Sequence, residues 1–215
     1  MRKYFDNDMK KLKKMLFDMG ILAEEIIDIS INSLLKKDEK LANRAIKLDE
    51  KVDEMEYIIE RKCLELIALQ QPMAKDLREI SAILKIITDI ERIGDHGVNI
   101  AKVTKRISKE EYIKPLIDIP KMADISKEMI RRSLESFVEK DVQLAKQVAK
   151  MDDTVDNIYE EIYVELLNKL TEDKRIMNQV INLLFIGRYI ERIADHTTNI
   201  CEKIIFMVDG KRIHY

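Results

Sequence analysis

The sequence predicts an all-α protein built as two tandem, pseudo-symmetric three-helix bundles whose long helices run up and down, antiparallel to one another. Three observations support this prediction: few helix-breaking residues, long apolar seams at helical spacing, and an internal duplication. The 215 residues include only 5 glycines and 3 prolines. A β-sandwich, a barrel or a nucleotide-binding α/β fold would need more turn residues, so these classes are disfavoured.

The overall composition is typical of a soluble protein with a balanced surface charge. The chain has 38 Lys and Arg residues and 40 Asp and Glu residues, and 46% of it is hydrophobic. Such a balance gives no general basic surface for nucleic acid. No apolar run approaches the roughly 18 residues of a membrane span, and Met1–Asp6 lacks the apolar core of a signal peptide. Cys63 and Cys201 lack metal or redox spacing and are expected to be buried, reduced thiols, so we expect a cytoplasmic protein.

The chain contains two copies of one unit. The segment Glu91–Ile100, with sequence ERIGDHGVNI, recurs as Glu191–Ile200, with sequence ERIADHTTNI. Seven of these ten positions are identical. Upstream, the two acids of residues 48–53 (LDEKVD) recur in residues 151–156 (MDDTVD). Composition alone does not produce such matches, so the protein is a tandem duplication.

The duplication divides the chain into two expected domains, residues 1–110 and residues 115–215. A linker is expected over residues 108–120, where two of the three prolines lie. The offset between the copies is 103 residues in their early part and 100 residues at the long motif. This difference predicts a shorter turn in the second copy, opposite Gln70–Pro72.

Each copy is expected to contain three long helices. Apolar residues at steps of three and four predict the first helix around Met9–Ser33. The second helix is expected to follow an Asp38 N-cap, and the third to begin at Pro72, since a first helical turn tolerates proline. In the second copy, Asp141 and Thr171 are the corresponding candidate N-caps.

Acidic residues lie where the apolar seam of the third helix should continue. Glu91 is in register with apolar Leu84 and Ile87, and Glu191 has the equivalent register in the second copy. Another acid follows four residues later, and the preceding helix carries a like-charged pair at the same spacing. If the second and third helices pack antiparallel, each bundle brings four carboxylates together. The two sets are Asp49, Asp53, Glu91 and Asp95, and Asp152, Asp156, Glu191 and Asp195.

A multivalent cation would make such a cluster favourable, because a buried charge without a partner is strongly destabilising. Carboxylates on facing bundle helices hold dinuclear metals in other proteins, and oxygen ligands suit hard or borderline metals. We therefore expect one polynuclear site in each repeat, with iron first and Mg, Mn, Ca or Zn as alternatives. The structural alternative is an ion-pair network in which Arg92, Arg188, Arg192 or lysines neutralise the acids.

Polar residues beside these acids are candidates for an outer coordination shell. His96 and His196 directly follow an acid, so their side chains point about 100° away from it around the helix. Asn99 and Asn199 lie four residues after an acid, on the same face. These groups would hydrogen-bond the ligands or contribute an oxygen. The alternative roles are helix packing for the histidines and interhelical hydrogen bonding for the asparagines.

The duplicated motif Glu-Arg-Ile-Gly/Ala-Asp-His-x-x-Asn-Ile, preceded in each half by Asp-x-x-Val-Asp, resembles the PhoU family of phosphate-uptake regulators. The resemblance covers about residues 8–208. It implies two three-helix bundles related by pseudo-symmetry, with metal clusters at the E/DxxxD positions. On this sequence those positions are Asp49, Asp53, Glu91, Asp95, Asp152, Asp156, Glu191 and Asp195.

The resemblance also implies a regulatory role. Family members signal between a phosphate ABC transporter, through its ATPase subunit, and a phosphate-sensing histidine kinase. They restrain phosphate uptake and the phosphate-starvation response when phosphate is plentiful. By this resemblance we expect a cytoplasmic, non-enzymatic, homodimeric regulator that reaches the membrane only through its partners.

Two other functions stay open. A carboxylate-bridged di-iron or di-manganese oxidase usually carries histidine three residues after a ligand glutamate. Here that position is Gly94 or Ala194, and His96 is five residues after Glu91, which disfavours oxygen activation. The other possibility is a metal-free helical adaptor, whose stability chelation would leave unchanged.

Overall fold

The computed structural model describes residues 2–211 and 213–215, and over these residues the protein contains helices and no strand. Met1 and Arg212, at the edges of the two predicted domains, lie outside the described residues. The helices are α1 (Arg2–Lys36), α2 (Glu39–Gln70), α3 (Ala74–Ile107), α4 (Asp118–Glu139), α5 (Val142–Ala149), α6 (Asp152–Glu172) and α7 (Met177–Asp209). A 3₁₀ turn, Lys174–Ile176, precedes α7.

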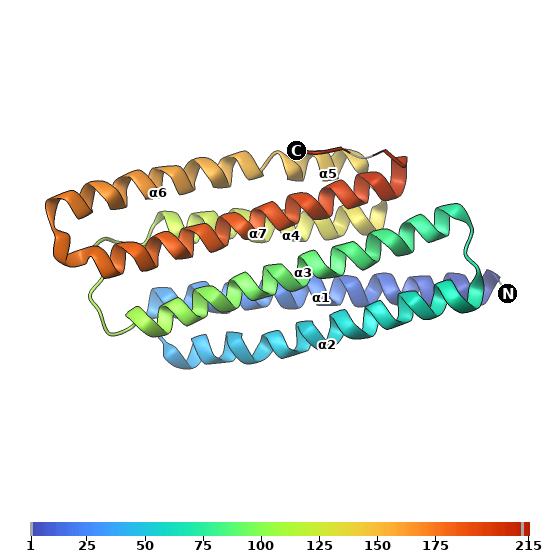
Figure 1. Cartoon of the computed structure of the whole chain (residues 1–215), viewed down its shortest axis with the longest axis horizontal. Coiled ribbons are helices and arrows are strands. Elements are labelled where there is room, and N and C mark those ends of the chain that lie inside the picture. The colour runs from blue at the N-terminus through green and yellow to red at the C-terminus, as the bar shows by residue number, and fades with distance from the viewer. Residues whose placement is uncertain (1, 212) are drawn as a thin grey trace.

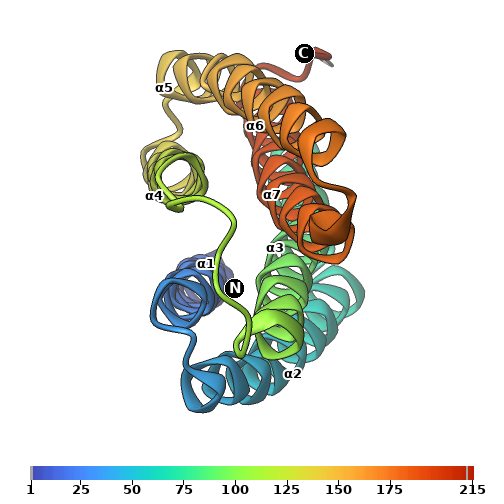
Figure 2. The same ribbon diagram turned by 90° about the vertical axis from the view of Figure 1, so that its left-hand side faces the viewer.

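The helices form two three-helix bundles side by side, as predicted. The first contains α1, α2 and α3, and the second contains α4, α7 and the α5–α6 pair, which together take the place of α2 (Figure 1). Figure 2, an end view, shows α1 beside α4 and α3 beside α7, with α2 and α6 at opposite ends of the array. The bundles therefore meet along two pairs of equivalent helices.

The core follows the predicted apolar seams. On α1, Leu12, Leu16, Met19 and Ile26 are almost fully buried. The α3 helix is apolar on more than one face, with a run of buried isoleucines from Ile80 to Ile93. This pattern arises because α3 packs both within its own bundle and against α7.

Two aspartates begin equivalent helices in the two copies, as predicted. The carboxylates of Asp38 and Asp141 each accept hydrogen bonds from the amides two and three residues further on, at 2.8–3.2 Å. The residue before each cap, Lys37 or Lys140, has a left-handed backbone conformation that ends the preceding helix. The same local sequence therefore makes the same helix–helix corner twice.

The predicted N-cap at Thr171 was wrong. Thr171 lies in the last turn of α6, where its hydroxyl donates to the carbonyl of Asn168. Asp173 begins the 3₁₀ turn instead, accepting a hydrogen bond from the amide of Arg175 at 2.9 Å. Three residues, 71–73, separate α2 from α3. In the second copy the 3₁₀ turn takes the place of the first turn of α3, and only Asp173 separates it from α6, so the irregular segment of the second copy is the shorter one.

Two predicted positions of proline were also wrong. Pro72 precedes α3, which begins at Ala74, and it follows Gln71, the left-handed residue that ends α2. Proline cannot continue a helix because it has no amide hydrogen to donate. Pro120 lies in the first turn of α4, where that hydrogen is not needed, so the linker ends at residue 117 rather than 120.

The equivalent of α2 is broken in the second copy, a feature that the sequence did not predict. Lys150 and Met151 interrupt the helix between α5 and α6. The break places Asp152 and Asp153 in the first turn of α6. A helix N-terminus stabilises negative charge, so Asp152 has local support that Asp49, in the middle of α2, lacks.

Both cysteines are buried and unpaired, and burial raises the pKa of each thiol to about 12. The thiols of Cys63 and Cys201 therefore behave as small apolar side chains, as predicted. Within the described residues, none of the helices contains a stretch apolar and long enough to span a bilayer.

We expect Asp38→Ala and Asp141→Ala each to lower the free energy of unfolding by about 1 kcal/mol, because two amides lose their acceptor. Asp38→Asn retains an acceptor and should recover most of this loss. Equilibrium unfolding in urea checks the values, with the exposed mid-helix substitution Glu50→Ala as control. An equal loss in the control would contradict the capping role.

Candidate functional site

The structure brings the eight predicted acids together in two groups. In the first bundle, α2 packs against α3, and in the second, α6 packs against α7. Acids on the facing helices lie close enough to raise one another's pKa, as Asp95 does for Asp49 and Asp195 does for Asp152. The first acid cluster is defined as Asp49, Asp53, Glu91 and Asp95. The second acid cluster is defined as Asp152, Asp156, Glu191 and Asp195.

A glycine makes room for the deepest carboxylate of the first acid cluster. A Cβ atom on Gly94 would lie only 2.7 Å from Oδ1 of Asp49. The carboxylate of α2 therefore rests directly against the backbone of α3. The equivalent position in the second copy is Ala194.

The acid clusters lie at the rim of the bundles, which differs from the expectation that they lie inside the core. The side chains of Glu91 and Glu191 are 18% and 12% exposed, and Asp53 and Asp156 are exposed. Glu91 continues the apolar seam only approximately, because a helical face drifts around the axis along a helix of this length. Each cluster therefore has a buried side and an open side.

Burial and mutual repulsion disfavour the charged form of the carboxyls in the first acid cluster. Burial raises the pKa of Asp49 to about 6, with further contributions from Asp53 and Asp95. Burial raises the pKa of Glu91 to about 7, and Asp95 contributes next. Positive charge nearby would reverse both effects.

Burial and mutual repulsion act in the same direction in the second acid cluster. Burial raises the pKa of Asp152 to about 7, with contributions from Asp156, Asp195 and Glu191. Burial, followed by repulsion from Asp195, also raises the pKa of Asp156 and of Glu191. The duplicated sequence therefore raises the pKa of equivalent carboxyls in both clusters, although Asp152 lies in the first turn of its helix and Asp49 does not.

Arginines neutralise part of each acid cluster, as the structural alternative predicts. Arg92 lies 3.3 Å from Glu91 and 3.1 Å from Asp95, and Arg192 lies 3.0 Å from Asp195. Arg188 pairs with Glu191. Arg92 and Arg192 are about half exposed, at 55% and 48%, so these pairs are at the open side and contribute little stability. Among the described side chains, neither Asp49 nor Asp152 takes part in an ion pair.

The donor atoms suit a hard cation. Oδ1 of Asp49 and Oε2 of Glu191 are buried and have no hydrogen-bond partner within the described part of the chain. Such orphaned carboxylate oxygens match the ligand preference of multivalent metals. As the described side chains are placed, no three Asp, Glu, His or Cys residues converge to hold a metal ion.

The two motif histidines lie between the bundles, facing each other. The ring of His96 is 5.6 Å from that of His196 and 5.8 Å from that of Tyr189. Nδ1 of His196 lies 2.9 Å from Oδ1 of Asp89. Burial, followed by the neighbouring His196, lowers the pKa of His96 to about 4, so this ring is neutral. The contacts of both rings correspond to helix packing, the alternative role expected for these histidines.

Asp89 was not among the predicted residues because its position is not repeated. Its equivalent in the second copy is Tyr189, so a search for matched residues passes over it. Asn99 and Asn199 are half-buried on α3 and α7, one turn after Asp95 and Asp195. Their predicted contribution to the acid clusters stays a prediction.

Comparison with known proteins gives a family match over both repeats. The model of the PhoU domain matches residues 16–104 and again residues 119–204. The chain is 44% identical to a phosphate-specific transport system accessory protein PhoU homolog from Clostridium acetobutylicum, over 99% of this chain and 97% of that protein. It is 39% identical to the homolog of the same name from Aquifex aeolicus, over 97% of this chain and 94% of that protein.

Solved structures give the same result. The fold is similar to the crystal structure of PhoU from Pseudomonas aeruginosa, with a TM-score of 0.92 and 32% identity over 96% of this chain and all of that chain. It is also similar to the phosphate transport system regulatory protein PhoU from Streptococcus pneumoniae, with a TM-score of 0.92 and 26% identity over 98% of this chain.

In buffer free of multivalent cations, the protein should lose stability as the pH rises from about 4 to about 7. The pKa of Asp49 is raised from 3.8 to about 6 and that of Asp152 from 3.8 to about 7. In this window the carboxyls with raised pKa values, Asp49, Glu91 and Asp152, bind more protons in the folded state than in the unfolded state. They outnumber His96, whose lowered pKa acts in the opposite direction, so the free energy of unfolding falls with pH. Asp49→Asn and Asp152→Asn should each reduce the fall, on the order of 1 kcal/mol after allowance for partial exposure.

Urea unfolding at a series of pH values in the presence of a chelator measures this effect. Glu50→Gln, on the exposed face of α2, is the control and should follow the wild type. A stability that rises through this window, or identical slopes in all variants, would contradict the prediction.

Proposed function

The chain belongs to the PhoU family, and we propose that it acts as an accessory protein of a phosphate-specific transport system and regulates phosphate uptake. The observation that carries the proposal is the likeness to proteins of that name along nearly the whole length of both chains. This likeness covers both repeats and includes both copies of the motif on α3 and α7.

The finer proposal is that the protein is a negative regulator on the cytoplasmic side of the membrane. It would link the ATPase subunit of a phosphate ABC transporter to a phosphate-sensing histidine kinase and would act as a homodimer. Long helices with exposed apolar side chains provide surfaces suited to docking against helices of partners. On α7, Met177, Ile181 and Phe185 are exposed at steps of four residues and form one such stripe.

Each acid cluster is proposed to bind a polynuclear metal site, with iron first and Mg, Mn, Ca or Zn as alternatives. The orphaned oxygens of Asp49 and Glu191 and the raised pKa values of the surrounding carboxyls support this role. A bound cation supplies positive charge that offsets the mutual repulsion of the acids. In the first acid cluster, Asp49 and Asp53 would hold the cation from α2, and Glu91 and Asp95 would hold it from α3.

We propose no catalytic role for the protein. The position three residues after Glu91, where a di-metal oxidase carries a histidine ligand, is Gly94, and its backbone lies against Asp49. The nearby His96 contacts Tyr189 and His196 between the bundles. The site is therefore suited to holding a cation rather than to opening a coordination position for oxygen.

We expect Mn²⁺ or iron, added to protein stripped with a chelator, to raise the thermal midpoint. Binding only to the folded state adds about 2.7 kcal/mol at a free cation concentration of 100 times Kd. Asp49→Asn with Glu91→Gln should remove binding in the first acid cluster and halve the metal content. Glu50→Gln with Glu54→Gln, on the exposed side of α2, should leave the metal content unchanged. Equal metal content in all variants would contradict the proposed ligands.

In cells, deletion of the gene should raise expression of phosphate-starvation genes in phosphate-rich medium, and the wild-type gene should reverse this. The purified chain should also bind the ATPase subunit of the transporter or the cytoplasmic part of the kinase. Unchanged expression in the deletion strain would reject the regulatory role, whatever the metal content of the protein.

A further inference from the structure

The facing helices α1 and α4 carry opposite charges at equivalent positions. The two helices correspond with an offset of 103 residues, the offset that also relates their closing corners. Glu24 and Asp28 of α1 therefore correspond to Lys127 and Arg131 of α4. One repeat is acidic at both positions and the other is basic at both.

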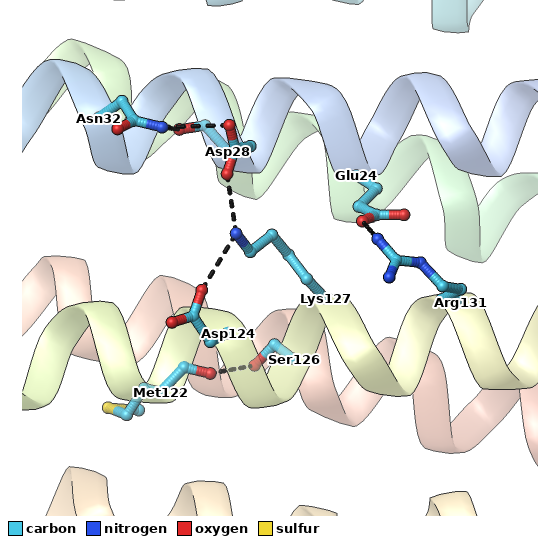
Figure 3. Close-up of polar contacts among 8 residues, drawn as sticks. All are labelled: Glu24, Asp28, Asn32, Met122, Asp124, Ser126, Lys127 and Arg131. Carbon is cyan, nitrogen blue, oxygen red and sulfur yellow. Dashed lines mark hydrogen bonds and ion pairs between the residues drawn. The ribbon is translucent and has the colours of Figure 1, made fainter.

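These four residues pair across the boundary between the bundles (Figure 3). Nζ of Lys127 lies 2.8 Å from Oδ1 of Asp28, and Arg131 pairs with Glu24. The two contacts are equivalent under the pseudo-symmetry. Glu24 and its equivalent Lys127 each contact the residue four positions further along the other helix, Arg131 and Asp28 respectively. In each contact one side chain is mostly buried: Glu24 is 14% exposed and Lys127 is 19% exposed. Lys127 also lies 3.1 Å from Asp124 of its own helix.

Two further contacts between the repeats have the same polarity. Glu79 of α3 lies 2.9 Å from Lys140, the residue that ends α4, and Asp89 of α3 lies 2.9 Å from His196 of α7. The equivalents of these two acids in the second repeat, Gln179 and Tyr189, carry no charge. Throughout residues 2–211 and 213–215, each contact between an acidic and a basic side chain on helices of the two repeats, end caps included, takes its acid from the first repeat and its base from the second. The Asp89–His196 contact is an ion pair only when His196 is protonated.

We propose that this separation of charge is a recognition code that makes the first repeat pair only with a second repeat, of the same chain or of another copy. Pairing two first repeats would set Glu24 against Asp28 twice, and pairing two second repeats would set Lys127 against Arg131 twice. Like charges that face each other across an interface reject the wrong partner. By fixing how the repeats pair, these charges also fix the position of the first acid cluster relative to the second. The proposal does not depend on the proposed role in phosphate uptake.

The test uses charge reversal in the full chain. Glu24→Lys with Asp28→Lys makes both faces basic, and Lys127→Glu with Arg131→Glu makes both acidic. Each pair of substitutions should raise the unfolding equilibrium constant roughly threefold to thirtyfold, and less so at high salt. All four substitutions together restore opposite charges and should return the constant to within about threefold of the wild type.

Glu25 and Arg44 provide the matched control. Their ion pair, at 2.8 Å, joins α1 to α2 within the first repeat. Glu25→Lys with Arg44→Glu should leave stability near the wild-type value at any salt concentration. An additive loss in the chain with four substitutions would overturn the code.

A mixing experiment measures directly whether repeats of different chains pair with each other. The variant with two basic faces (Glu24→Lys with Asp28→Lys) and the variant with two acidic faces (Lys127→Glu with Arg131→Glu) are unfolded and refolded together. They should form a one-to-one complex by exchange of repeats, which native mass spectrometry detects. The ten-residue linker, 108–117, can extend to roughly 33 Å, which permits such an exchange. Refolding that gives only the separate chains would contradict recognition between repeats of different copies.

Discussion

The packing of α3 against α7 is the contact on which the rest of the molecule depends. Each helix is apolar on two sides, so it completes the core of its own bundle and also joins the two bundles. This double burial places His96 and His196 at the shared boundary. It also turns the acids of both helices toward the neighbouring helix of their own bundle, α2 or α6, which is how two separate acid clusters arise.

The acid clusters are poorly suited to stability and well suited to binding. Half-buried carboxyls with raised pKa values, and buried oxygens without a hydrogen bond, make a folded protein less stable unless a positive group arrives. Arginines supply part of that charge from the open side but do not reach Asp49 or Asp152. A stable helix bundle normally gives each buried charged group a partner, and both repeats depart from this at the same place. Such a departure is typical of a functional site.

The two repeats agree where each acid cluster is built and differ where they face each other. The eight motif acids are matched in position, Asp for Asp and Glu for Glu, and seven of the ten positions of the long motif are identical. The two histidines at the boundary, His96 and His196, are matched, but four other positions there are not: Glu24 and Lys127, Asp28 and Arg131, Glu79 and Gln179, and Asp89 and Tyr189. Identical repeats would meet through identical charges, so these differences stabilise the joined form of the molecule.

Local chemistry in the sequence determined the helical class, the duplication, the aspartate caps at Asp38 and Asp141, and the identity of the acids that gather. Helical periodicity is sufficient for this because it states which residues share a face. It does not state which neighbour covers that face. Only the tertiary structure placed the acids at the rim, turned the histidines toward each other and gave Asp89 its partner, because these depend on how the bundles pack together.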